Sequence, residues 1–172
     1  MKEVKKILIC GGGMMGSAIA QVLAGLDDVT ITVYDKFPVD IEANIRNNMK
    51  LLVEKEIVTP ADVDKVISKI SFTQDIESEG VKSADLVVEC VLEDMQLKQD
   101  LFAQLEGIVS EDTIFCTNTS VMSPTEISAK CKHKERLVGT HFWNPGFLIP
   151  LVEVVRTEAT TDEVVETVMD ML

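Results

Sequence analysis

Residues 6–35 read KILICGGGMMGSAIAQVLAGLDDVTITVYD, and this stretch decides the fold class. A short apolar run, Lys6–Cys10, ends in glycines. Apolar residues then recur at helical spacing up to Leu23, and a second apolar run follows over Val29–Tyr34. The order of strand, tight turn, helix and strand predicts the first unit of a parallel sheet.

The turn after the first strand satisfies the pattern G-x-G-x-x-G. In this context Gly11 permits the sharp turn, Gly13 lets the backbone approach a pyrophosphate, and Gly16 allows close packing of helix on strand. The helix start at Met14 and Met15 offers unpaired N–H groups and a positive dipole end to the phosphates. The pattern therefore predicts a dinucleotide site, and a glycine-rich turn in an unrelated α/β domain is the alternative.

A carboxylate at the end of the second strand supports the dinucleotide reading. Asp35 follows Gly16 by 19 residues, where it can accept hydrogen bonds from the adenosine ribose hydroxyls. The same carboxylate would repel a 2′-phosphate, although Lys36 beside it acts in the opposite sense. We therefore expect NAD as the cofactor in preference to NADP.

Helices and strands alternate along the rest of the chain. Helices are predicted over Val39–Glu56, Pro60–Ser68 and Leu97–Ile108, with further starts at the capping-box spacings Ser123 to Glu126 and Thr160 to Glu163. Strands are predicted over Ile70–Thr73, Asp85–Val91, Thr113–Thr117, Leu137–Thr140 and Leu151–Val155. This alternation predicts an α/β fold of the Rossmann type, a doubly wound and mostly parallel sheet with helices on both faces.

Length and composition limit the function classes. With 172 residues and 46% hydrophobic content, we expect one domain, and no apolar run reaches the roughly 18–20 residues that span a bilayer. The net charge of −13 disfavours nucleic acid and anionic membranes as partners, and we expect a cytoplasmic protein. The four cysteines lack metal-ligand spacing, so we expect structural thiols and no metal. They are Cys10, Cys90, Cys116 and Cys131.

A second group of polar residues suggests proton transfer. Oxidation of an alcohol requires removal of the hydroxyl proton as hydride leaves carbon, and a histidine is suited to this because it titrates near neutrality. His141 is followed twelve residues later by Glu153, which could orient the ring and balance its charge. Ser120 and Asn144 could hydrogen-bond the reacting oxygen. The other histidine, His133, lies in a charged connection and is not expected to be catalytic.

Each of these residues also has a purely structural interpretation. His141 could be a hydrogen-bonded core histidine, and Glu153 could be a strand residue that faces solvent. Asn144 with the following proline could form a turn, and Ser120 could be an ordinary loop hydroxyl. Taken singly, none of them decides the function.

Further motifs accompany these residues in a fixed order. They are LVVECVLED over residues 86–94 with Leu97-Lys98 and Leu101-Phe102, TNTS over 117–120, HFWNP over 141–145 and LVEV over 151–154. Together with the glycine loop and Asp35, they resemble the NAD-binding domain of the 3-hydroxyacyl-CoA dehydrogenase family. The resemblance runs from about Lys5 to the end of the chain.

The resemblance implies roles for individual residues. His141 matches the general base of the family, and Glu153 matches the glutamate that pairs with it. Ser120 and Asn144 match residues that contact the substrate oxygen and the nicotinamide end. The implied reaction passes hydride from C3 of an (S)-3-hydroxyacyl-CoA to NAD, giving a 3-ketoacyl-CoA.

Other matched positions are expected to bind the cofactor and the substrate. Glu93 and Lys98 match positions at the nicotinamide ribose, and Asn118 belongs to the same loop as Ser120. The helix over Val39–Glu56 resembles an insertion that approaches the CoA moiety, so an acyl-CoA is the expected partner. Its cations are Arg46, Lys50 and Lys55. They form either a thin phosphate site or a solvated face.

Two departures from the family limit the assignment. The family continues into an all-helical C-terminal domain that closes the substrate cleft and carries most of the dimer contact, and nothing in residues 1–172 corresponds to it. We therefore expect the NAD-binding domain alone, poorly active by itself, of an enzyme that is a homodimer when complete. The second departure is GFLIP over residues 146–150. This segment resembles members that act on gulonate or carnitine about as well as it resembles the fatty-acyl enzymes. A dehydrogenase of a hydroxy acid without CoA and a non-catalytic NAD(H)-binding module stay as alternatives.

Overall fold

Seven strands form one sheet in the order β3-β2-β1-β4-β5-β6-β7 in the computed structural model, which describes residues 2–172. The strands are β1 Lys6–Cys10, β2 Thr30–Tyr34, β3 Ile70–Thr73, β4 Leu86–Glu89, β5 Ile114–Thr117, β6 Leu137–Phe142 and β7 Val152–Val155. Neighbouring strands from β3 to β6 pair in parallel, and β7 pairs antiparallel with β6. The predicted mostly parallel, doubly wound sheet is confirmed.

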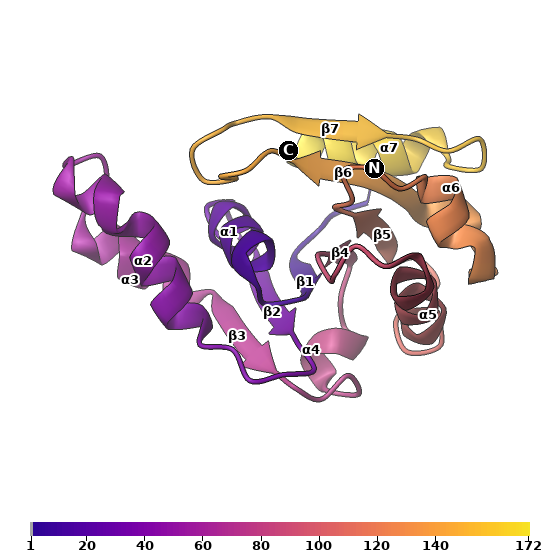
Figure 1. The fold of residues 1–172 in the computed structure, drawn as a ribbon, viewed down its shortest axis with the longest axis horizontal. Coiled ribbons are helices and arrows are strands. Elements are labelled where there is room, and N and C mark those ends of the chain that lie inside the picture. Colours follow the sequence, from indigo (N-terminus) through magenta and orange to yellow (C-terminus); the bar gives the residue numbers. More distant parts are fainter. Residues whose placement is uncertain (1) are drawn as a thin grey trace.

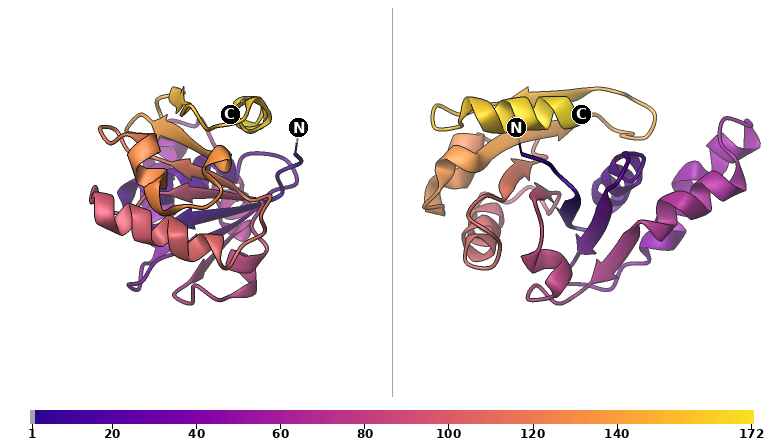
Figure 2. Two further views of the ribbon diagram at one scale, coloured as in Figure 1. Left: turned by 90° about the vertical axis from the view of Figure 1, so that its right-hand side faces the viewer. Right: turned by 180° about the vertical axis from the view of Figure 1, so that it is seen from behind.

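Helices cover both faces of this sheet (Figures 1 and 2). They are α1 Met14–Leu23, α2 Ile41–Glu54, α3 Pro60–Ser68, α4 Glu79–Lys82, α5 Met95–Glu106, α6 Pro124–Ile127 and α7 Asp162–Met171, with short 3-10 turns at Ser128–Lys130 and Lys134–Arg136. In Figure 1, α1, α2 and α3 lie on one side of the sheet, and α4 and α5 lie on the other. No helix within residues 2–172 is long and apolar enough to cross a membrane.

Alternation along the central strand explains the two layers. In β1, Ile7 and Ile9 pack into a cluster with α1, α2 and α7, whereas Leu8 and Cys10 pack into a second cluster with α4, α5 and α6. All four side chains are buried. Because successive strand residues point to opposite faces, a wholly apolar strand is stable only when both faces are covered. Each buried aliphatic side chain contributes about 1.5–3 kcal/mol.

The last strand is antiparallel because its connection to β6 is short. A parallel connection needs a crossover of roughly a dozen residues or more, usually a helix. The segment between Phe142 and Val152 contains no helix and turns back directly. The resulting register places His141 opposite Glu153 and Gly139 opposite Val155.

Two predicted helix starts need correction. The expected cap at Thr160 is wrong, because Thr161 accepts the hydrogen bond from the Val164 N–H. Thr160 is buried, and its hydroxyl donates instead to the Leu137 carbonyl at 2.7 Å. The expected capping box at Ser123 also lacks its side-chain hydrogen bond, although α6 does begin at the next residue. Helix α4 was not predicted, because four residues are too few to show helical periodicity.

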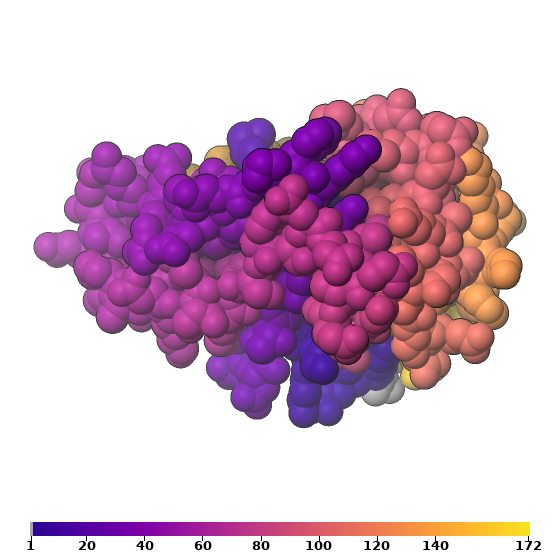
Figure 3. Space-filling view, turned by 90° about the horizontal axis from the view of Figure 1, so that it is seen from below, coloured from indigo at the N-terminus to yellow at the C-terminus, as the bar shows by residue number. Residues whose placement is uncertain are grey.

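Helices α2 and α3 form one end of the molecule (Figures 1 and 3). Thr59 and Asp62 form the capping box at the start of α3, with the Thr59 N–H donating to Asp62 at 2.8 Å. On α2, Arg46 pairs with Glu42 and with Asp64 at 2.9 Å each. The positive charge of Arg46 is therefore already paired with carboxylates of α2 and α3.

Candidate cofactor and catalytic site

The carboxyl ends of the central strands meet beside Gly11. This residue follows β1 with φ +103°, and its N–H donates to the Tyr34 carbonyl at 2.8 Å. A Cβ on Gly11 would lie 2.7 Å from the carbonyl oxygen of Cys90, so only glycine allows the end of β1 to approach the end of β4. Strand order reverses between β1 and β4, which is where open α/β sheets bind ligands.

The other two motif glycines differ in the space around them. A Cβ on Gly16 would lie 1.8 Å from the carbonyl oxygen of Gly11, so this position holds α1 against the turn. A Cβ on Gly13 would meet nothing within 4 Å. Gly13 is also the N-cap of α1 and offers no side chain to the first helical N–H groups. Open space in front of these donors fits a diphosphate, which a larger side chain would displace.

Asp35 lies against the same turn. Its Oδ2 accepts from the Gly12 N–H at 2.8 Å, and its Oδ1 accepts from the Phe37 N–H at 3.0 Å. The half-buried carboxylate therefore sits between the glycine turn and the exposed residues Lys36 and Phe37. The carboxylate that we predict to bind the ribose therefore lies directly beside the glycine turn.

His141 and Glu153 face each other across β6 and β7. Nδ1 of His141 lies 2.7 Å from Oε2 of Glu153. Hydrogen bonds from His141 and then from Trp143 hold the pKa of Glu153 below its ordinary value. Because a carboxylate only accepts, Nδ1 carries the proton and Nε2 of the neutral ring is left as an acceptor. With 25% of its side chain exposed, His141 is not a sealed core histidine.

A cavity of about 260 Å³ brings most of the predicted residues together. It is lined by Met15, Cys90, Val91, Glu93, Lys98, Asn118, Ser120, His141, Phe142 and Asn144. A second cavity of about 210 Å³ is lined by Glu153 and shares Ser120 and His141 with the first. The remaining predicted residues do not line either cavity. They lie in the turn after β1, in the first turn of α1 and directly after β2, and are Gly11, Gly13, Met14, Gly16 and Asp35.

Hydrogen bonds fix the loop that carries Ser120. Glu93 accepts from the Ser120 N–H at 3.1 Å and from the Thr119 hydroxyl at 3.0 Å. The side-chain oxygen of Asn118 accepts from the Phe142 N–H at 2.9 Å, which ties this loop to β6. The loops after β4 and β5 and the end of β6 are thus joined through side chains of the predicted site.

One buried residue of this region was not predicted. Glu89, at the end of β4, is fully buried and pairs with Lys98, whose Nζ lies 2.6 Å from Oε1. The signal in the sequence was a charged residue at the end of the otherwise apolar strand Leu86–Val88. A charge in such a strand requires partners inside the protein.

The other histidine lies outside both cavities, whereas Cys90 lines the 260 Å³ cavity. His133 is half-buried, and its Nδ1 lies 3.0 Å from Oε1 of Glu135. All four cysteines are free. Burial raises the pKa of Cys116 to about 12 and that of Cys131 to about 11, so these thiols are poor nucleophiles.

Comparison with known proteins places the chain in a family. The family model described as '3-hydroxyacyl-CoA dehydrogenase, NAD binding domain' matches residues 6–172. A probable 3-hydroxybutyryl-CoA dehydrogenase of Bacillus subtilis is 38% identical over 170 residues, covering 97% of this chain and 58% of that protein. The mitochondrial hydroxyacyl-coenzyme A dehydrogenase of Sus scrofa is 37% identical over 174 residues, covering 97% and 55%.

A solved structure supports the same conclusion. The crystal structure of 3-hydroxybutyryl-CoA dehydrogenase from Escherichia coli K12 has a TM-score of 0.91 and 32% identity, covering 99% of this chain and 36% of that one. The chain spans little more than half of the two curated relatives above. It belongs to the 3-hydroxyacyl-CoA dehydrogenase family and corresponds to the NAD-binding domain of that family.

Proposed function

We propose that this chain provides the NAD(H) site and the general base of a dehydrogenase that interconverts (S)-3-hydroxyacyl-CoA and 3-ketoacyl-CoA. The observation that carries the proposal is the shared cavity. His141, Ser120 and Asn144 meet there with Met15 at the start of α1 and with Glu93 and Lys98, and Glu153 pairs with His141 from the adjoining cavity. A base and a cofactor site that share one cavity suit coupled proton and hydride transfer.

The cofactor would be held by residues at the carboxyl edge of the sheet. The diphosphate would lie against Gly13 and the start of α1, and Asp35 would accept from the adenosine ribose. Glu93 and Lys98 would line the nicotinamide end. When bound, NAD supplies the hydride acceptor.

The protein's own residues would manage the proton. Glu153 fixes the tautomer of His141, so Nε2 is the atom that would take the hydroxyl proton. The carboxylate then stabilises the imidazolium that forms. Ser120 and Asn144 would orient the substrate oxygen, and Ser120 lines both cavities, where cofactor and substrate would meet.

The remaining expectations about the complete enzyme also stay proposals. A further all-helical domain would close the substrate cleft and carry a homodimer contact, so this domain alone should turn over slowly because water enters an open cleft. The names of relatives include mitochondrial and peroxisomal proteins, and the cytoplasmic location stays a prediction.

The proposal is tested by titrating the chain with NADH and NADPH and then adding acetoacetyl-CoA to the NADH complex. We expect tighter binding of NADH and slow loss of absorbance at the nicotinamide band. His141→Gln should keep NADH binding and slow the oxidation by about 10²–10⁴-fold, as the loss of a general acid or base does. His133→Gln is the matched control and should behave as the unaltered chain. Equal rates for His141→Gln would contradict the assigned base, and no NADH binding would contradict the cofactor site.

A second candidate is an NAD-dependent dehydrogenase of a hydroxy acid without CoA. One observation favours it, because Arg46, one of the three cations that could contact a CoA phosphate, is already paired with Glu42 and Asp64. Faster NAD reduction with free hydroxy acids such as gulonate or carnitine than with 3-hydroxybutyryl-CoA would select this candidate. NADH binding with no turnover of either class would select the non-catalytic binding module.

A further inference from the structure

A buried carboxylate lies behind the cofactor cavity. Glu89 is 0% exposed and accepts three hydrogen bonds. Its Oε1 accepts from Lys98 Nζ at 2.6 Å and from the Val91 N–H at 2.8 Å, and its Oε2 accepts from the Thr117 hydroxyl at 2.7 Å. The donors come from α5, from the turn after β4 and from the end of β5. One carboxylate therefore links three elements that border the cavity.

Its partner faces the cavity. The side chain of Lys98 is 1% exposed, yet it lines the 260 Å³ cavity together with Glu93. Lys98 Nζ also lies 3.3 Å from Oε2 of Glu93, and Glu93 accepts from the Ser120 N–H. A continuous series of contacts thus runs from the buried Glu89 to the loop of Ser120.

Stability alone does not account for a charged pair at this position. Burial raises the pKa of Glu89, and Lys98 beside it acts in the opposite direction. Replacement of a buried ion pair by apolar residues of similar volume is often neutral or stabilising. The surrounding cluster contains Leu101 and Phe102 from the same helix and could accept an apolar pair. A role in the cavity explains the pair better.

We propose that Glu89 is a positioning residue of the cofactor cavity, which acts by holding the Lys98 ammonium against the wall that Glu93 and Ser120 share. This rests on the proposed NAD(H) site. Without the Glu89 charge, Lys98 would turn toward the more exposed carboxylate of Glu93. That shift would displace the cation along the cavity wall and make it compete with the Ser120 N–H for the Glu93 carboxylate.

Two single variants test the proposal through the dissociation constant of NADH. Glu89→Gln keeps an oxygen that accepts from Lys98 and Val91 and places an NH2 group that donates to the Thr117 hydroxyl, so it removes the charge and reverses one hydrogen bond. We expect about tenfold weaker NADH binding. Thr117→Val removes one hydrogen bond to Glu89 at nearly constant volume, and we expect a loss of about threefold. Thermal unfolding shows that each variant is folded. If Glu89→Gln does not fold, Thr117→Val still decides the outcome.

A combined variant shows whether Glu89 acts through Lys98. The pair E89Q/K98M removes both charges, so no buried charge is left without a partner. In this background Thr117→Val should change the NADH dissociation constant by less than twofold. An equal loss in both backgrounds would overturn the proposal, as would unchanged NADH binding in the folded single variants.

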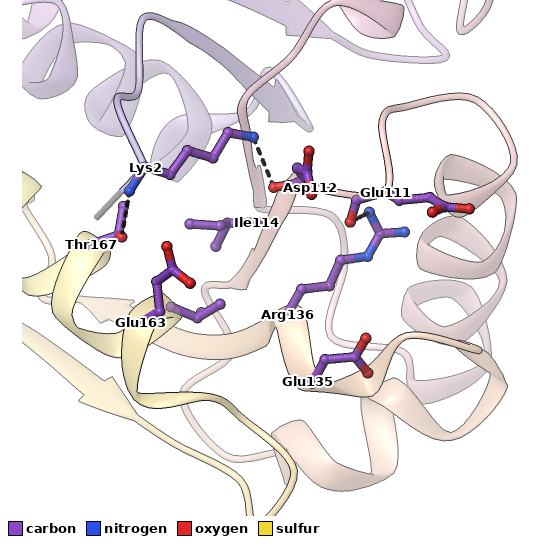
Figure 4. Close-up of a pocket in the computed structure, with 9 residues that line it drawn as sticks. Lys2, Glu111, Asp112, Ile114, Glu135, Arg136, Glu163 and Thr167 are labelled. Atoms are coloured by element: carbon purple, nitrogen blue, oxygen red, sulfur yellow. Dashed lines mark hydrogen bonds between the residues drawn. The ribbon is translucent and has the colours of Figure 1, made fainter.

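The matched control is a second buried ion pair far from the cavity. Arg136 Nη2 lies 3.4 Å from Glu106 Oε1, and both side chains are nearly fully buried. Figure 4 shows Arg136 beside Lys2, Glu111 and Asp112 in a separate cavity, at the amino ends of β5 and β6. Glu106→Gln should lower the melting temperature and leave NADH binding unchanged. If it weakens NADH binding as Glu89→Gln does, the effect is general destabilisation and the positioning role is wrong.

The outcomes separate this inference from the proposed function. If the unaltered chain does not bind NADH, both fail. If it binds NADH and the Glu89 and Thr117 variants bind equally well, the cofactor site stands and only the positioning role of Glu89 fails.

Discussion

Addition of a single methyl group at Gly13 should separate NADH binding from stability. Gly13→Ala places a Cβ in the open space before the start of α1, where nothing lies within 4 Å. The backbone there has φ −66°, which alanine adopts without strain. Loss of chain entropy in the unfolded state favours alanine by about 0.4–1 kcal/mol, and its poorer N-cap preference acts by a similar amount in the opposite direction. The net change in the free energy of unfolding should therefore lie within about 1 kcal/mol.

The effect on the cofactor should be much larger. A methyl group in this space would keep a diphosphate from the N–H groups at the start of α1. Loss of one hydrogen bond to a charged group costs about 1.5–3 kcal/mol, which corresponds to a dissociation constant larger by roughly 10- to 150-fold. Gly16→Ala is the comparison, because its Cβ would lie 1.8 Å from Gly11, where real contacts do not fall below 3.0 Å. That conflict should destabilise the fold by about 1–3 kcal/mol or more.

The assay is fluorescence titration with NADH together with urea denaturation of the three proteins. We expect Gly13→Ala to unfold near the midpoint of the unaltered chain and to bind NADH at least tenfold more weakly. Gly16→Ala should unfold at a clearly lower urea concentration. The reasoning is refuted if Gly13→Ala binds NADH normally, or if it loses as much stability as Gly16→Ala.

Three further predictions concern pH, cofactor choice and the core. The pKa of Glu153 is lowered mainly by the hydrogen bond from His141, so the stabilisation it gives is present above the ordinary glutamate pKa of about 4.3 and is lost as pH falls through the lowered value. The difference in melting temperature between the unaltered chain and Glu153→Gln should be constant from pH 7 to 5 and shrink toward pH 3. A difference that stays the same at pH 3 would contradict the assigned stabilisation by the Glu153 carboxylate. Asp35→Ser should reduce the preference for NADH over NADPH by about tenfold, measured as a ratio of dissociation constants; an unchanged ratio would mean that Asp35 does not contact the ribose. Phe102→Ala removes a ring that is 0% exposed and lies 5.1 Å from the Phe115 ring, and should cost about 3–5 kcal/mol in urea denaturation, so a loss below 1 kcal/mol would be inconsistent with this packing.

Periodicity in the sequence was sufficient to predict most elements of the fold. The apolar strands and the stripes of α1, α2 and α5 report burial directly, because each face must be covered. Predictions based on one hydroxyl were less accurate, as at Thr160, where the hydroxyl bonds β6 and the neighbouring Thr161 caps the helix. A hydroxyl has several acceptors within reach, and only the folded chain decides among them.

The site shows the same division. The sequence alone was sufficient to predict the glycine turn, Asp35, His141 and Glu153 as site residues. Their types and order also indicate the family without any knowledge of the geometry. The sequence did not predict that Glu89, Lys98 and Thr117 interact. Lys98 lies nine residues from Glu89 in the sequence, and Thr117 lies 28 residues from it. Contacts of this kind depend on which strand ends become neighbours.

The sequence by itself determined the α/β alternation, the dinucleotide turn and the family, because apolar spacing and the steric demands of glycine are local properties. Only the tertiary structure decided that β7 runs antiparallel, that Glu153 therefore meets His141 at 2.7 Å, and that Lys98 is paired with Glu89 and Glu93 at one cavity. These features follow from strand order and register, which bring distant segments to the same edge of the sheet. The residue types determine which chemical groups are present, and the packing determines the distances between them.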